Sequence, residues 1–239
     1  MTNSIEKIND KTYQISENGK NLGTITTYQN SFHNEYLYLR FNLNHFPSFS
    51  PFPEIIKSEN KPLQVMIDST EKELISFLTK NSFQLKRRCY SPKVSQHLLK
   101  NALPNHPVKI TKFTSDDSIY EKCCEFLYDY YKKVHEAVSP LTSTKEEFFE
   151  EVPTKSGYFQ VDQNNNIENL AFIEDNEIAY ICSTNKETCL SFIQAVLKEL
   201  FSKYQEIFFE ADDTDWAATM LLDQFVVDRT DSFNTYLLN

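Results

Sequence analysis

The chain has 239 residues, of which 40% are hydrophobic and 24% are charged, with 19 Phe and 13 Tyr. This composition excludes an intrinsically disordered protein and supplies enough apolar side chains for one large domain or two small ones. The formal net charge of -10 repels phosphate backbones and anionic lipid, so neither nucleic acid nor a membrane surface is an expected partner.

The first part of the chain is typical of an antiparallel meander. Period-two patterning predicts strands at 11–16, 22–28 and 36–43, and Asn18 with Gly19 predicts the first turn. A Phe-rich segment with three prolines follows. Because proline lacks an amide hydrogen and has a fixed φ, we expect a loop here whose phenylalanines pack on the sheet. These prolines are Pro47, Pro51 and Pro53.

A strand and helix unit comes next. Residues 63–67 form an apolar run that ends at the helix-capping residues Asp68 and Ser69, and leucine and phenylalanine recur at helical spacing from Thr70 onward. Residues 84–90 predict another strand. The segment from 91 to 107 contains three prolines and is mostly polar, so it is the expected domain boundary.

The second half repeats this alternation over a longer stretch. Thr144 with Glu147 is a capping-box pattern that starts a short helix. The helix predicted at 190–204 is indicated by apolar residues at alternating steps of three and four. In chain order the predicted elements are a strand at 108–113, a helix beginning at 115 or 116, the short helix, strands at 157–161, 167–173 and 178–182, a helix at 190–204, a strand at 207–210, a helix at 216–222 and a strand at 232–238.

The two halves end alike. The stretches VMIDSTEKELISFLTKNSF at 65–83 and FFEADDTDWAATMLLDQF at 208–225 each combine an apolar strand, an acidic or hydroxyl cap, an amphipathic helix and a closing Phe. A strand with a late tyrosine follows each of them, at Tyr90 and Tyr236. The repeat suggests a duplication.

The order of elements across 108–239 resembles that of the GNAT superfamily of acyl-CoA-dependent acyltransferases. Residues 10–90 resemble the same fold without its first helices and its central helix. The resemblance implies a mixed α/β sheet, built as an incomplete N-terminal copy and a nearly complete C-terminal copy. The expected division is a half-domain at 1–92, a linker at 93–107 and a GNAT-like domain at 108–239.

In that family the acyl-CoA lies where two parallel strands diverge, so the resemblance implies acetyl-CoA or another acyl-CoA as co-substrate. Its pantetheine would pair with the backbone of Ile181, Cys182 and Ser183, and its pyrophosphate would lie on the following helix N-terminus. Asn185, Lys186 and Thr188 are the expected binding residues there. The family places glycines at this turn, whereas this chain has a side chain at every position from 184 to 189.

Acyl transfer to an amine needs a base, and the resemblance places a carboxylate near the strand ends. Glu210, Glu174 and Glu177 are the candidates, although solvated turn acids explain the last two as well. The acidic run after Glu210 is read either as a helix N-cap cluster or as an amine-binding patch. Members of the family often have a tyrosine five residues before the phenylalanine of a Gly-Phe pair, and this tyrosine acts as the acid that protonates the leaving thiolate. Counting back from Phe225 gives Met220 instead.

Two functions therefore follow from the resemblance. The first is an N-acetyltransferase that acts on a small-molecule or peptide amine. The alternative is a catalytically inactive GNAT-like protein that binds a ligand or serves as a scaffold. We expect a monomer or a homodimer.

The cysteines and histidines bear on cofactors and location. The five cysteines include no CxxC pair and no histidine at ligand spacing, so the sequence predicts neither a metal site nor a disulfide framework. Cys182 and Cys189 flank the cofactor turn, where a thiol can have a lowered pKa or can be a buried packing residue. Free thiols and the lack of a signal-peptide pattern in the sequence given favour the cytoplasm.

Overall fold

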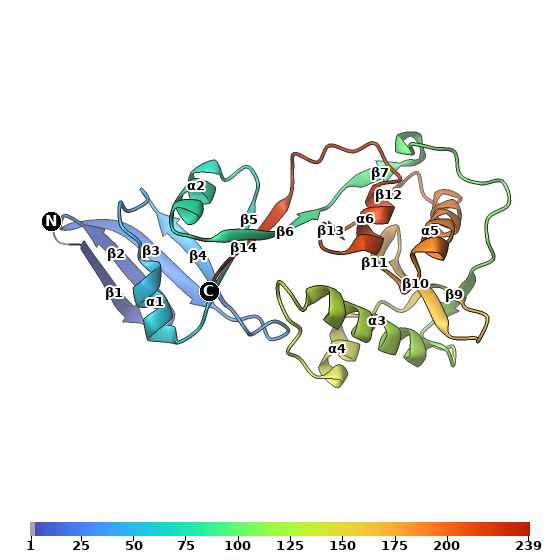
Figure 1. Ribbon diagram of the computed structural model, residues 1–239, viewed down its shortest axis with the longest axis horizontal. Coiled ribbons are helices and arrows are strands. Elements are labelled where there is room, and N and C mark those ends of the chain that lie inside the picture. Colours follow the sequence, from blue (N-terminus) through green and yellow to red (C-terminus); the bar gives the residue numbers. More distant parts are fainter. Residues whose placement is uncertain (1–2) are drawn as a thin grey trace. The chain divides into compact units, whose positions relative to one another are not determined.

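The computed structural model describes residues 3–239, which form two compact units (Figure 1). Unit 1 combines the chain up to Arg88 with residues 136–143 and 231–239, and unit 2 combines residues 89–135 and 144–230. In the part of the chain that the structure covers, no helix is long and apolar enough to cross a membrane.

The sheet of unit 1 begins as an antiparallel meander. It continues with β5, which pairs parallel to β4, and with β14, the last strand of the chain, which pairs antiparallel to β5. Its order is β1-β2-β3-β4-β5-β14-β6. Asn18 and Gly19 have φ values of 52° and 76°, so the predicted turn between β2 and β3 forms from residues that tolerate this conformation. The strands are β1 (Asn3–Asn9), β2 (Thr12–Glu17), β3 (Lys20–Tyr28), β4 (Leu37–Leu43), β5 (Leu63–Asp68), β6 (Gln84–Tyr90) and β14 (Phe233–Leu238).

The proline-rich segment contains a helix where a loop was expected. Helix α1 (Phe52–Glu59) has Pro51 as its N-cap residue and a second proline in its first turn. The prediction failed because a proline at the start of a helix removes an amide that has no partner in the helix anyway. Unit 1 thus has a short helix between β4 and β5, which corrects the expectation that this copy lacks the central one.

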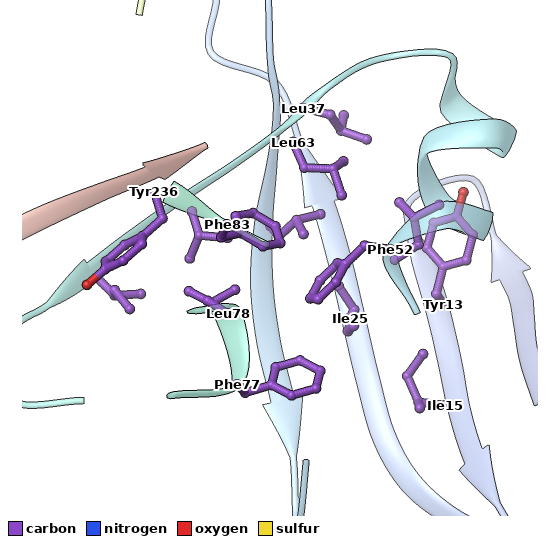
Figure 2. Packing of buried hydrophobic residues seen from close by; sticks show 14 residues of the cluster. Tyr13, Ile15, Ile25, Leu37, Phe52, Leu63, Phe77, Leu78, Phe83 and Tyr236 are labelled. Atoms are coloured by element: carbon purple, nitrogen blue, oxygen red, sulfur yellow. The ribbon is translucent and has the colours of Figure 1, made fainter. Parts of the chain in front are cut away.

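The core of unit 1 gathers aromatic rings from three parts of the chain (Figure 2). Phe52 of α1 lies 4.8 Å from Phe83 and 5.5 Å from Phe77, ring centre to ring centre. Phe77 belongs to α2 (Lys72–Lys80). Tyr236 of β14 packs in the same cluster and is only 5% exposed, so the last strand of the chain completes the core of the first unit.

Unit 2 contains the longer helices and a sheet of order β7-β12-β11-β10-β9-β8. Thr144 and Glu147 form the predicted capping box at the start of α4. The strands are β7 (Lys93–Ser95), β8 (Thr111–Thr114), β9 (Ser156–Val161), β10 (Ile167–Glu174), β11 (Glu177–Ser183), β12 (Glu206–Phe209) and β13 (Ala211–Asp212). The helices are η1 (Gln96–Leu98), α3 (Tyr120–His135), α4 (Lys145–Glu151), α5 (Lys186–Phe201) and α6 (Trp216–Leu222).

Each sheet contains a strand that pairs with a partner far away in the sequence. β14 pairs with β5 along its whole length, from Phe233 opposite Asp68 to Leu238 opposite Leu63. β7, inside the segment expected to be a linker, pairs with β12. The two compact units therefore do not have the same boundaries as the expected division into 1–92, 93–107 and 108–239. The pattern of residues in a segment predicts that it forms a strand, but the tertiary structure decides which strand it pairs with.

Candidate functional site

Strands β11 and β12 of unit 2 diverge shortly after they meet. Their parallel pairing is limited to Glu177 with Phe208 and Ile178 with Phe209. At the same point β11 has a bulge, because Phe172 and Ile173 of β10 pair with Tyr180 and Ile178 and leave Ala179 as the extra residue. A bulge bends its strand and increases its twist. The divergence expected at this place is confirmed, and the bulge gives its local cause.

Beyond the bulge, β11 continues to Ser183 with β10 on one side only among the residues described. Ile181, Cys182 and Ser183 pair with Ala171, Leu170 and Asn169 and are nearly fully buried. In an antiparallel pair, successive residues direct their backbone groups alternately to the two sides. Alternate peptide groups of this stretch therefore face the side from which β12 has departed.

The N-terminus of α5 follows directly. Asn185 is the N-cap, and its side-chain oxygen accepts a hydrogen bond of 3.0 Å from the amide of Glu187. The side-chain nitrogen Nδ2 of Asn185 donates to Glu168 at 2.9 Å, and the Thr188 hydroxyl donates to the other Glu168 oxygen at 2.7 Å. The side chains of Asn185 and Thr188, both expected to contact a cofactor, are thus engaged by a carboxylate of β10.

Lys186 points to a different place. Its ammonium nitrogen lies 5.3 Å from the ring centre of Trp216, the only tryptophan of the chain. Together they line a cleft of about 320 Å³ between the start of α5 and helix α6, called the Lys186–Trp216 cleft below. Its other lining residues are Asp213, Thr214, Thr219, Met220 and Asp223. The cleft offers one cation, one large aromatic face and two carboxylates.

The three candidate acids lie near one another at the other end of β11. Burial raises the pKa of Glu177, and the negative charges of Glu174 and Glu210 raise it further. Burial also raises the pKa of Tyr180 to about 12, with smaller effects from Cys182, Glu210 and Glu177. A carboxylate with a raised pKa among other carboxylates can accept a proton, and the group as a whole attracts cations.

A partly buried pair that the sequence did not reveal joins α3 to α6. The Tyr130 hydroxyl donates a hydrogen bond of 2.6 Å to Asp215, whose carboxylate also caps α6 by accepting from the amides of Ala217 and Ala218. Burial raises the pKa of Asp215 although these hydrogen bonds oppose the shift. Asp215 was readable as a helix cap, but its partner lies 85 residues away and leaves no local signal.

The thiols beside the turn are packing residues. Burial raises the pKa of Cys189 to about 11 and raises that of Cys182 as well. A lowered pKa, one of the two readings of these cysteines, is therefore excluded. No cysteine among the described residues is in a disulfide, and no cluster of three or more His, Cys, Asp or Glu within residues 3–239 has a geometry suited to a metal ion.

Unit 1 repeats the strand divergence without a matching site. β4 and β5 pair only through Leu37 with Leu63 and Tyr38 with Gln64. The helix between them starts with the fully buried Phe52, whose ring packs against the rings of Phe77 and Phe83. Apolar side chains therefore cover this part of unit 1, and the candidate site belongs to unit 2.

Comparison with solved structures identifies the fold. A GCN5-related N-acetyltransferase from Sphaerobacter thermophilus is 11% identical, with a TM-score of 0.51 over 98% of this chain and 81% of its own. A probable N-acyltransferase of unknown function from Enterococcus faecalis is 8% identical, with a TM-score of 0.52 over 95% and 61%. A tandem GNAT protein from the clavulanic acid biosynthesis pathway is 6% identical, with a TM-score of 0.51 over 95% and 81%.

These likenesses concern the fold. No protein-family model matches the sequence, and no curated protein matches it. At such low identities a common fold does not carry a common activity. The chain has the mixed α/β fold of GNAT N-acetyltransferases, including tandem ones, and this confirms the fold expected from the order of its elements.

Proposed function

We propose that this protein is an acyl-CoA-dependent N-acyltransferase whose active site lies in unit 2. The observation that carries the proposal is the divergence of β11 from β12 at the Ala179 bulge, beside the Lys186–Trp216 cleft. A gap between strands with backbone groups on one side suits an extended, amide-containing arm. Free thiols and an acidic surface are compatible with the cytoplasm, where acyl-CoA is made.

The residues present fit an acyl-CoA in part. The backbone of Ile181, Cys182 and Ser183 would pair with the pantetheine, and Lys186 would neutralise a phosphate. Trp216 offers a flat face for a ring. When bound, the acyl-CoA supplies an activated acyl group as a thioester.

The acidic group around Glu177 would serve the acceptor. A protonated amine is attracted by Glu174, Glu177 and Glu210, and it must lose a proton before it can attack a carbonyl. Glu177 is the candidate base, because its partial burial and its acidic neighbours favour proton uptake. The acceptor class is therefore a small-molecule or peptide amine that carries positive charge.

A second candidate is a ligand-binding protein without turnover. Met220 lines the Lys186–Trp216 cleft where the resemblance leads one to expect a tyrosine acid, and a thioether cannot donate a proton. Binding of acyl-CoA without transfer would favour this alternative.

Intrinsic fluorescence tests the proposal, since Trp216 is the only tryptophan. Titration with CoA or acetyl-CoA is expected to change the Trp216 emission and to raise the melting temperature. Lys186→Glu is expected to weaken binding by about tenfold or more, because it reverses the charge beside the phosphates. Lys132→Glu, an exposed position on α3, is the matched control.

The outcomes separate the candidates. If millimolar CoA and acetyl-CoA leave both the fluorescence and the melting temperature unchanged, the proposal is rejected. If acetyl-CoA binds, release of free CoA in the presence of a panel of polyamines, amino acids and peptides identifies an enzyme. Binding with no release across the panel supports the second candidate.

A further inference from the structure

Glu168 occupies a special position in β10. Ile167 pairs with Val161 and Asn169 pairs with Gln160, so Glu168 is an extra residue in a bulge. A bulge redirects a side chain relative to the regular alternation of the strand. The Glu168 backbone also accepts a hydrogen bond of 3.0 Å from the Thr184 amide, which ties the bulge to the turn before α5.

The side chain of Glu168 is held at the first turn of α5. One carboxylate oxygen accepts from Asn185 at 2.9 Å and the other accepts from Thr188 at 2.7 Å. The fully buried Asn169 donates to the Thr188 oxygen at 3.0 Å. The Thr188 hydroxyl in turn lies closer to Glu168, at 2.7 Å, than to its other acceptor, the backbone oxygen of Asn185, at 3.4 Å. Both oxygens of the carboxylate therefore have donors on the helix cap.

The charges at this helix end sum against an added anion. Glu168 and the exposed Glu187 bring two negative charges to the first turn, and Lys186 brings one positive charge. The partial positive charge of a helix N-terminus is about half an elementary charge. The ammonium group of Lys186 lies over the ring of Trp216. A diphosphate at the tip would therefore be repelled by two carboxylates.

We infer that Glu168 is a built-in anion beside the α5 N-terminus and that it excludes an external phosphate from the helix tip. The inference concerns only this chain's own residues, and it holds whether or not the proposed function is correct. Glu168 is thus a specificity-determining residue, and Asn169 and Thr188 are positioning residues that hold it.

Inorganic pyrophosphate tests exclusion without any acyl donor. Wild-type protein is expected to bind pyrophosphate only weakly. Glu168→Gln keeps the shape of the side chain and removes the charge, so pyrophosphate affinity is expected to increase by about tenfold or more over wild type. The readouts are Trp216 fluorescence and isothermal titration calorimetry, with the melting temperature recorded to verify folding.

Two further variants serve as comparisons. Glu199→Gln removes the same charge near the C-terminal end of the same helix and is expected to leave pyrophosphate affinity unchanged. Glu187→Gln removes an exposed charge at the tip and is expected to give a smaller gain than Glu168→Gln. If Glu168→Gln does not fold, Glu187→Gln still tests the inference. No gain in pyrophosphate affinity in Glu187→Gln would then contradict the claim that carboxylates exclude phosphate from the tip.

The inference is overturned if Glu168→Gln binds pyrophosphate no better than Glu199→Gln. It is also overturned if the wild type already binds pyrophosphate as tightly as Glu168→Gln. The proposed function is tested separately with CoA: Lys186→Gln should weaken CoA binding by about tenfold relative to the wild type. Failure of CoA to bind any variant would contradict the proposed function, while the pyrophosphate comparison would still decide the role of Glu168.

Discussion

The Tyr130 hydroxyl and the Asp215 carboxylate form a hydrogen bond of 2.6 Å in the interior of unit 2. Tyr130 lies on α3, and Asp215 is the residue that starts α6, so a single bond fixes the start of one helix to the middle of another. Cys182 of β11 and Cys189 of α5 are near enough to raise the pKa of Tyr130, after burial and Asp215. The pair therefore lies where the diverging strand and three helices meet.

Tyr130→Phe is expected to lower the free energy of unfolding by about 1–3 kcal/mol, because the buried Asp215 loses a donor and keeps its desolvation cost. Chemical denaturation measures this change. Tyr128→Phe is the matched control, since its ring contacts with Phe148 and Phe149 remain. Equal losses in the two variants would show that the Tyr130 hydroxyl contributes no special stability.

Asp215 predicts a pH dependence of stability. Its pKa in the folded state is raised above 3.8 by burial, so the folded protein binds a proton that the unfolded chain has already released. The contribution of Asp215 is fully present below about pH 4 and is lost as pH rises through the raised folded pKa. Asp215→Asn keeps an N-cap but does not titrate. Its stability relative to wild type should therefore increase from about pH 4 to pH 7, and a difference independent of pH would contradict this account.

Glu177→Gln tests the proposed base. If Glu177 accepts the amine proton, the substitution should lower kcat/KM by roughly 100-fold or more while CoA affinity stays the same. In wild type, kcat/KM should rise with pH through a pKa above 4.5, because only the ionised carboxylate acts as a base. The corresponding limb of the pH profile should vanish in the variant. Asp175→Asn, in the neighbouring turn, is the control that should retain both activity and profile.

A substitution of Tyr236 tests whether the last strand, β14, stabilises unit 1. Tyr236→Ala should cost roughly 3–5 kcal/mol, since the side chain is 5% exposed within the aromatic core. Phe233→Ala lies in the same strand but at a position that is 46% exposed, and it should cost about 1 kcal/mol or less. Amide hydrogen exchange in β5 should be faster in Tyr236→Ala than in the wild type. Protection of β5 equal to wild type would argue against a stabilising role of β14 in this sheet.

The local elements of this fold are largely readable from the sequence. The Asn18-Gly19 turn, the Thr144 capping box and helix α6 formed where the residue pattern indicated, because turn chemistry, caps and apolar spacing act over a few residues. Helix α1 was missed because three nearby prolines hide the fact that two of them stand at positions where a helix accepts proline.

The site was predictable in part. The divergence after Ile178 follows from the order of elements, and the grouping of Glu177 with Glu174 and Glu210 follows from one hairpin and its neighbour strand. The bulge that places Glu168 on the cap of α5 and the bond from Tyr130 to Asp215 left no signal in the sequence. Each depends on side chains that are separated along the chain and meet only after the sheet has formed.

The sequence by itself thus determined where strands and helices form, since backbone propensity and periodic burial are properties of short segments. Only the tertiary structure decided that β14 joins the sheet of unit 1, that β7 joins the sheet of unit 2, and that the Glu168 carboxylate binds the side chains of Asn185 and Thr188 at the start of α5. These outcomes depend on which edges and charges meet in space, and that choice is made by the packing of the whole unit.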